Sequence, residues 1–130
     1  MILLDSHTWI WHVQGEKQLP RSHAEIILQN ESVGIGVSMI SLWEIAKAVE
    51  SGGLRLPISV EDWLDMALAY PGIKLLPLTP RIVVESTKLP SGFHKDPADQ
   101  IIVATARVYD CPLLSSDKKI LNYPHVKLQL

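Results

Sequence analysis

Short apolar runs alternate along the chain with longer stretches of helical periodicity. Three runs predict buried strands, namely "MILL" at 1–4, "SVGIGV" at 32–37 and "IKLLPL" at 73–78, because each is short and largely apolar. Two more candidates follow later in the chain, "PLLSS" at 112–116 and the weaker "VKLQL" at 126–130. Continuous apolar runs of this length are typical of strands that are covered on both faces, as in a parallel sheet.

Helical patterns fill the intervals between these runs. They fall at 7–14, 21–30, 38–53 and 60–69, for about two turns after residue 79, from residue 97 onward, and briefly within 117–124. Ser59, Thr79 and Asp96 stand where three of these helices begin, as N-cap residues do. Pro80 and Pro97 then occupy the first helical position of two of them. Strands separated by helices predict an α/β fold, with a parallel sheet, helices on both faces and right-handed crossovers.

Length and composition narrow the class of protein. The chain of 130 residues has no repeat, linker or low-complexity stretch, so we expect one domain spanning 1–130. A formal net charge of −2 argues against a protein that coats nucleic acid through bulk positive charge.

Cellular location is suggested by two further features of the sequence. Cys111 is the only cysteine, so it cannot form an internal disulfide, and we expect a buried, inert thiol in a reducing cytoplasm. The first residues lack the pattern of a signal peptide, and no apolar run approaches the ~20 residues that span a bilayer. We therefore expect a soluble cytoplasmic protein with no membrane association.

Four acids fall where predicted strands end or the next helices begin. Asp5 ends the first strand, and Glu44 lies in the first turns of the helix after the second strand. Asp99 lies in the first turn of the helix before the fourth strand, and Asp117 follows that strand. These positions share one edge of a parallel sheet, the edge where ligands bind. Carboxylates gathered at ~4 Å repel each other by about 1 to 4 kcal/mol per pair, so such a cluster needs a cation.

Two of these acids also have a purely structural interpretation. Glu44 fits a capping box with Ser41, in the pattern S-x-x-E. Asp117 could cap the short turn that begins at Lys118. Both interpretations stay open at the level of sequence.

Capping explains the other two acids less well. Asp99 is not needed as a cap if Asp96 is the N-cap of the same helix. Asp5 follows directly on a buried strand and has no reciprocal capping partner in the sequence. All-oxygen ligation by such carboxylates and water suits Mg²⁺ or Mn²⁺ rather than zinc. Because Mg²⁺ commonly serves phosphate chemistry, the working hypothesis is metal-dependent phosphodiester hydrolysis.

Other chemistries find less support in the sequence. His7 and His12 are five positions apart, which misses the i, i+4 spacing of a helical zinc pair. Ser6 lacks the G-x-S-x-G context of a nucleophile, and no phosphate-binding G-x-x-x-x-G-K-[ST] loop occurs. His94, like His7, lies near the predicted pocket and could touch phosphate, although an ordinary surface role is favoured. Candidate contacts to an RNA backbone, with solvated surface charge as the alternative, are Lys47, Arg55, Lys118 and Lys119.

Several stretches of the chain resemble the PIN-domain ribonucleases, in particular the VapC-like toxins of type II toxin–antitoxin modules. They are "LLDSHTWIW", "VSMISLWEIAKAVESGGLRLP", "LPLTP", "LPSGFHKDPADQIIVATA" and "LLSSDKKILNYP". The resemblance covers about residues 2–124 and brings the acids in the family's order. It implies one PIN-like domain with a five-stranded, mostly parallel sheet flanked by helices, and an acidic pocket that binds Mg²⁺ or Mn²⁺ and cleaves RNA.

The resemblance also implies roles for the acids. Asp5 and Asp99 are similar to the family's metal ligands, and Glu44 to the glutamate that shapes the pocket and reaches the metal or its water. Asp117 corresponds to a fourth acid whose importance varies, so all four are catalytic candidates. Asp96 is typical of the DP-x-D form and is interpreted as a cap. Ala98 stands where many relatives have an aromatic residue, a departure that touches packing near the pocket.

Partners are implied by the resemblance as well. Such toxins are held inactive by an antitoxin whose tail covers the pocket, and they are commonly homodimers within a larger toxin–antitoxin complex. The four tryptophans could contribute to these surfaces, although core packing is favoured for each of Trp9, Trp11, Trp43 and Trp63.

Two other functions remain as alternatives. A receiver-type signalling domain has two adjacent acids after the first strand and a phosphoacceptor aspartate after the third, whereas "LLDSH" offers one acid and "LLPLTP" none. A catalytically weak PIN-like binding module would keep the pocket and act only through its antitoxin.

Overall fold

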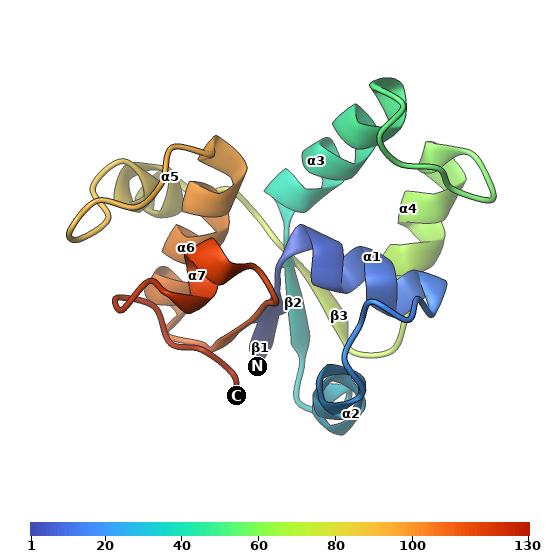
Figure 1. Cartoon of the computed structure of the whole chain (residues 1–130), viewed down its shortest axis with the longest axis horizontal. Helices are drawn as coiled ribbons and strands as arrows, with labels where there is room; N and C mark the ends of the chain where they lie inside the picture. Colours follow the sequence, from blue (N-terminus) through green and yellow to red (C-terminus); the bar gives the residue numbers. More distant parts are fainter.

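The computed structural model describes residues 1–130. Its elements follow one another as β1 (Ile2–Leu4), α1 (Ser6–Gln14), α2 (Arg21–Asn30), β2 (Ile35–Ser38), α3 (Met39–Glu50), α4 (Val60–Leu68), β3 (Ile73–Leu76), α5 (Pro80–Ser86), α6 (Pro97–Tyr109), β4 (Leu113–Leu114) and α7 (Lys118–Leu121) (Figure 1). Helices therefore separate the strands, as predicted. None of the helices has both the length and the apolar character needed to cross a membrane.

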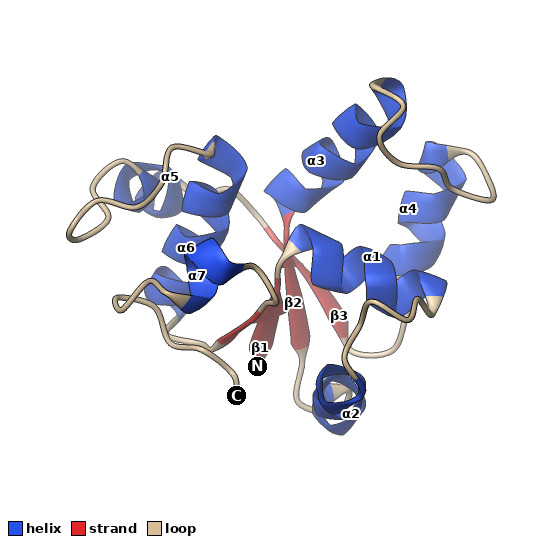
Figure 2. Ribbon diagram, in the orientation of Figure 1, coloured by secondary structure: helices blue, strands red, loops and turns tan.

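The strands form one parallel sheet in the order β3-β2-β1-β4 (Figure 2). On one side of β1, Ile2 pairs with Ile35 of β2, and on the other side Leu3 pairs with Leu113 of β4. Because the pairings are all parallel, the carboxyl ends of the four strands lie along the same edge. We call this edge the acid rim, after the residues described below.

Two hydrophobic cores cover the two faces of the sheet. Side chains alternate along β1, so that Ile2 and Leu4 join one core and Leu3 joins the other. The first core includes residues of α1, α2 and α4, with Trp9 and Trp63 fully buried. The second core is formed with α5, α6 and α7, which lie across the sheet from them (Figure 1).

The predicted helix starts are confirmed. Ser59, Thr79 and Asp96 are the N-caps of α4, α5 and α6, and each side chain accepts a hydrogen bond from a backbone N–H in the first turn of its helix. Pro80 and Pro97 are the first helical residues of α5 and α6. These starts were predictable because capping depends on residues that are adjacent in the sequence.

The prediction of five strands is wrong, since the sheet has four. The segment 126–130 makes only one bridge, between Leu128 and Leu113. Leu113 donates to the Lys127 carbonyl at 2.9 Å, and the Gln129 amide donates to the Leu113 carbonyl at 3.0 Å. Because β4 is only two residues long, the ladder on its outer side has no room to continue.

Two expectations about packing have opposite outcomes. Cys111 is buried as expected, and its burial raises the pKa of the thiol. Trp43 departs from the preference for core packing, because it is 57% exposed on α3. The Lys47 ammonium lies 5.9 Å from the centre of its ring.

Candidate functional site

Asp5 is held at the acid rim by hydrogen bonds to both carboxylate oxygens. It follows β1 directly and is buried. Its Oδ1 accepts from the Thr8 amide at 2.9 Å, and its Oδ2 accepts from the Ser115 hydroxyl. Asp5 is therefore the N-cap of α1, so the expectation that capping does not explain this acid is wrong, although the cap is not reciprocal because Thr8 Oγ1 has no hydrogen-bond partner. Each oxygen keeps a second lone pair that a further ligand can use.

Asp117 is tied to the same place through Ser115. The Ser115 hydroxyl that donates to Asp5 also accepts from the Asp117 amide at 3.0 Å. The Asp117 side chain caps α7, because its Oδ1 accepts from the Lys119 amide at 2.8 Å. The capping interpretation of Asp117 is thus confirmed. The residue nevertheless lines the same cavity as Asp5.

Glu44 is held by serines rather than by a capping box. The N-cap of α3 is Ser38, and Ser41 lies inside the first turn, so the capping-box interpretation is wrong. Glu44 Oε1 lies 2.5 Å from Ser6 Oγ, which in turn lies 2.7 Å from Ser41 Oγ. Because an ionised carboxylate only accepts, Ser6 donates to Glu44 and Ser41 donates to Ser6. This chain of hydrogen bonds joins the amino end of α1 to the first turns of α3.

Asp99 has no capping role, as predicted. The N-cap of α6 is Asp96, whose Oδ1 accepts from the amides of Ala98 and Asp99 at 3.0 and 3.3 Å. The Asp99 carboxylate faces His94 instead, with Oδ2 lying 3.0 Å from His94 Nε2. The approach is close in distance, but its angle is not that of a hydrogen bond, and His94 Nε2 remains without a partner. Asp99 thus stays free to bind another group.

The pKa of Asp99 indicates that the acids of the rim lie near one another. Burial and then repulsion by Asp96, Glu44, Asp117 and Asp5 raise the pKa of Asp99 to about 7. Since each of these acids acts on Asp99, all four predicted site residues lie on one rim.

The pKa of Glu44 is also raised by burial, against the lowering effect of its hydrogen bond from Ser6. The carboxylates at the rim therefore carry more negative charge than the neighbouring protein groups compensate. The carboxylates do not form a closed cage, however, and no three His, Cys, Asp or Glu side chains stand close enough together to hold one ion.

A cavity of about 250 Å³ opens beside Asp5 and Asp117, whereas Glu44 and Asp99 do not line it. It is lined by Asp5, His7, Thr8, Trp11, Ser116 and Asp117. The amino half of α1 thus supplies one wall, and the segment between β4 and α7 supplies another.

Sequence reasoning missed the hydroxyls that hold the acids. Ser115 orients Asp5, and Ser6 orients Glu44. Ser6 was considered only as a nucleophile. Ser115 directly follows β4, but the strand predicted at 112–116 includes it, so the rule that selects acids at strand ends does not reach it. No local signal links Ser6 to Glu44 either, because 38 positions separate them.

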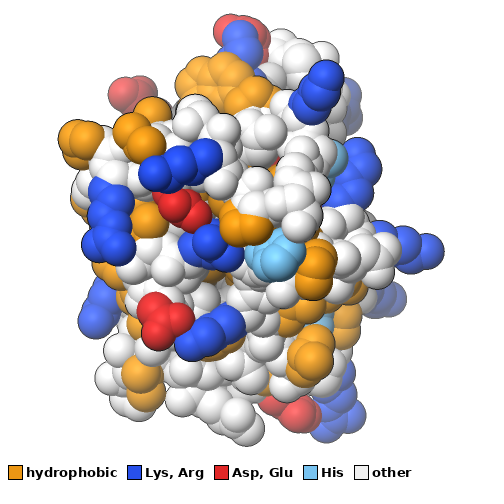
Figure 3. Space-filling model, turned by 90° about the vertical axis from the view of Figure 1, so that its left-hand side faces the viewer, with side chains coloured by type: hydrophobic (Ala, Val, Ile, Leu, Met, Phe, Trp, Pro, Cys, Tyr) orange, Lys and Arg blue, Asp and Glu red, His pale blue; other side chains and the backbone are white.

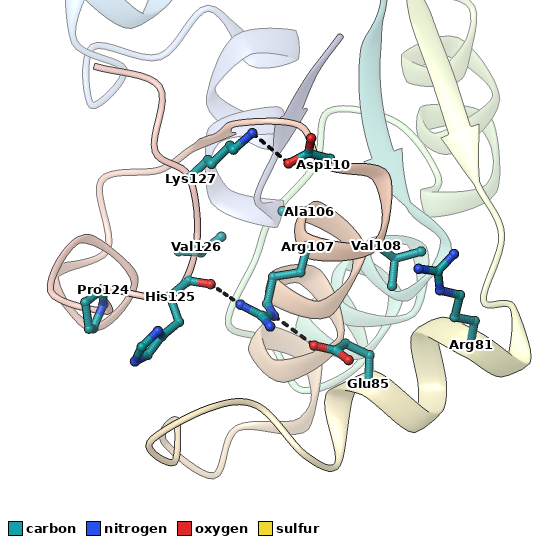
Figure 4. A pocket seen from close by; sticks show the side chains of 10 residues that line it. All are labelled: Arg81, Glu85, Ala106, Arg107, Val108, Asp110, Pro124, His125, Val126 and Lys127. Atoms are coloured by element: carbon teal, nitrogen blue, oxygen red, sulfur yellow. Dashed lines mark hydrogen bonds and ion pairs between the residues drawn. The ribbon is translucent and has the colours of Figure 1, made fainter.

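A second cavity, of about 450 Å³, has a different charge pattern. It lies between α5, the carboxyl end of α6 and the segment 124–127 (Figure 4). Arg107 pairs there with Glu85 at 2.8 Å, and Lys127 pairs with Asp110 at 2.6 Å. The face around it mixes basic and acidic side chains (Figure 3). Apart from that of Arg81, the Lys, Arg, Asp and Glu charges in this cavity are therefore paired, unlike those at the acid rim.

Comparisons with known proteins agree with this architecture. The sequence profile of the PIN domain matches residues 2–126. Ribonuclease VapC22 of Mycobacterium tuberculosis is 29% identical over 124 residues, which cover 95% of this chain and 92% of that protein.

Similar solved structures include toxin–antitoxin complexes. The structure of VapBC2 from Rickettsia felis bound to a promoter DNA fragment has a TM-score of 0.74 at 17% identity, covering 99% of this chain and 98% of the other. FitAcB from Neisseria gonorrhoeae has a TM-score of 0.66 at 20% identity, covering 99% and 97%. At these identities the likeness supports the fold. With the profile matching nearly the whole chain, the protein belongs to the PIN domain family.

Proposed function

We propose that the protein is an endoribonuclease dependent on Mg²⁺ or Mn²⁺, and that it acts as the toxin of a toxin–antitoxin pair. The observation that carries the proposal is the convergence of Asp5, Glu44, Asp99 and Asp117 on one rim, where burial and then the charges of Asp96, Glu44, Asp117 and Asp5 raise the pKa of Asp99 to about 7. Such an excess of like charge is typical of functional sites. The similarity to a ribonuclease named VapC22, and to a structure from Klebsiella pneumoniae named as a toxin–antitoxin complex, supports the choice of activity.

The residues at the rim fit Mg²⁺ or Mn²⁺. The proposed ligands and their supporting residues offer carboxylate and hydroxyl oxygens, which hard cations prefer, and no cysteine lies among them, although the imidazoles of His7 and His94 are near. Asp5 and Asp99 are the proposed ligands. Mg²⁺ is often held by one or two carboxylates with water completing its shell, so a cage of three side chains is not required. When bound, the ion would activate water and stabilise negative charge on the phosphate.

The chain's own residues supply orientation and proton transfer. The Thr8 amide and the Ser115 hydroxyl fix the direction of the Asp5 carboxylate, as supporting residues of metal ligands do. Ser6 fixes Glu44 at the rim. Because its pKa is raised towards the working pH, Glu44 is suited to take a proton from the attacking water. Asp117 adds negative charge beside Asp5.

The proposed partner is an antitoxin with a basic segment. Such a segment would cover the acid rim and compensate its charge, which is how a partner of complementary charge reaches its site. A homodimer within a larger toxin–antitoxin complex, in the cytoplasm, belongs to the same proposal.

Purified protein tests the activity directly. With Mg²⁺ or Mn²⁺ it should cleave RNA, EDTA should stop cleavage, and Asp5→Asn and Asp99→Asn should each lose activity. Cleavage that persists in EDTA and in both variants would contradict the proposal. Tight antitoxin binding with no turnover at any metal concentration would instead favour the binding module.

A further inference from the structure

The cavity beside Asp5 has an aromatic wall as well as an acidic one. His7 and Trp11 both line it, from positions i and i+4 of α1, which lie on one face of a helix. Their ring centres are 5.9 Å apart, with the planes tilted by 44°. Asp5 and Asp117 line the same cavity. An aromatic surface therefore lies directly beside the carboxylates.

Trp11 differs from the other tryptophans of the chain. Trp9, two positions earlier in α1, is fully buried and belongs to the core. Trp43 is mostly exposed on α3 and does not line the cavity. Trp11 is only partly buried, because one part of it packs on the core while another part lines the cavity. Packing of the core thus does not use the whole of this side chain.

Thr8 gives a second and independent indication that the cavity takes a ligand. It lines the cavity, it is fully buried, and its Oγ1 has no hydrogen-bond partner in the protein. Buried hydroxyls are nearly always hydrogen-bonded, so an unpartnered one calls for an explanation. A polar group of a ligand in the cavity would supply the missing partner.

We propose that this cavity is a nucleobase subsite, in which Trp11 and His7 stack one base next to the scissile phosphate and Thr8 hydrogen-bonds the same nucleotide. The inference rests on the proposed ribonuclease function. Proteins that read unpaired RNA stack its bases on aromatic side chains, because every base presents a flat π-face. The subsite lies beside Asp5, where a nucleotide adjoining the cut must pass. It therefore adds base recognition to a rim that otherwise meets only the phosphate.

The first test is a kinetic comparison of intact RNA with RNA that lacks one base. In a set of oligonucleotides, each carrying a single abasic site near the cut, the wild-type protein should lose about 5- to 100-fold in kcat/KM at one position. Trp11→Leu, which keeps an apolar side chain but no ring, should show a similar loss on intact RNA and no further loss at that position. Trp11→Phe should restore most of the activity, and Trp43→Leu should behave as wild type. Thermal melting would verify that each variant is folded.

A crosslinking measurement covers the case in which Trp11→Leu does not fold. RNA with 5-iodouridine at the sensitive position should crosslink to wild-type protein in the tryptic peptide 1–17, which contains His7 and Trp11. Crosslinks only to other peptides would overturn the subsite.

The outcomes separate the subsite from the activity. If the wild type cleaves RNA but a folded Trp11→Leu variant responds to every abasic site as the wild type does, the subsite is wrong and the activity stands. If the wild type cleaves no RNA, the proposed activity fails, and the subsite is judged from RNA binding in Ca²⁺. Binding weakened by Trp11→Leu but not by Trp43→Leu would support it, and equal or absent binding would overturn it.

Discussion

The charged side chains at the two ends of α6 differ in how far neighbouring charges compensate them. At its amino end, Asp99 lies among Asp96, Glu44, Asp117 and Asp5, and their repulsion adds to burial in raising its pKa. About 20 Å away, at its carboxyl end, every charge in the cavity of Figure 4 except that of Arg81 has an oppositely charged neighbour. One helix thus joins a region of uncompensated charge to a region of paired charge.

The difference indicates what each region is for. Paired charges such as Arg107 and Glu85 fasten α5 to α6 and satisfy each other within the protein. Like charges held together cost folding free energy, so their presence is explained by a ligand that compensates them. We therefore expect substitutions at the two ends of α6 to have opposite effects on activity and stability.

The largest expected effect is on RNA cleavage. Asp99→Asn should lower kcat by about 10³-fold or more, because it removes a proposed metal ligand. Asp110→Asn is the matched control at the other end of the same helix. Asp110 is exposed and adopts a left-handed backbone conformation that asparagine tolerates. The activity of the Asp110→Asn variant should therefore equal that of wild type. Equal losses of kcat in the two variants would show that the two ends of α6 do not differ in their importance for cleavage.

The second effect is a dependence of stability on pH in metal-free protein. The pKa of Asp99 is about 7 in the folded state against an ordinary value of 3.8. Between these values the folded protein retains a proton that the unfolded chain has released, so the free energy of unfolding falls as the pH rises from about 4 to about 7. The fall should be about 1–3 kcal/mol after solvent screening.

Urea denaturation in EDTA at pH 5 and pH 8 measures this fall. Asp99→Asn should lack most of it and should be the more stable protein at pH 8. Identical pH dependence in wild type and variant would show that the charge of Asp99 is compensated after all.

The third effect is a loss of stability at the paired end. Arg107→Ala should lower the free energy of unfolding by about 2 kcal/mol, because it leaves Glu85 and the His125 carbonyl without their partner. Arg81→Ala, in the same cavity but exposed, should change it by less than about 0.5 kcal/mol. Denaturation midpoints would show both values, and cleavage should be unchanged in both variants.

The smallest effect concerns the support of Glu44. Ser6→Ala should reduce kcat by about 10-fold, as the loss of a group that orients a site residue does. Without the hydrogen bond that lowers it, the pKa of Glu44 should rise, and the acid limb of the pH–rate profile should move to higher pH. Ser22→Ala, an exposed serine of α2, should leave the profile unchanged. A reduced rate with an unmoved profile would argue against this role of Ser6.

Much of the fold was predictable because its signals are local. The starts of α4, α5 and α6 were correct to the residue, since a cap and its proline or amide partners are neighbours in sequence. The prediction of a fifth strand was wrong, because a segment can form a strand only where its neighbour is long enough to pair with it. The capping box at Glu44 failed for a different reason, since Ser38 is the N-cap and α3 begins at Met39, two residues before Ser41.

The sequence by itself determined the order of the elements and placed four acids at strand ends and helix starts, because periodicity and capping act over a few residues. Only the tertiary structure decided which groups hold those acids. Ser115 reaches Asp5 across 110 positions, and Ser6 reaches Glu44 across 38. It also decided that the charge at the rim stays uncompensated while that at the other end of α6 is paired. Contacts between distant residues depend on how whole elements pack, and no local pattern encodes that packing.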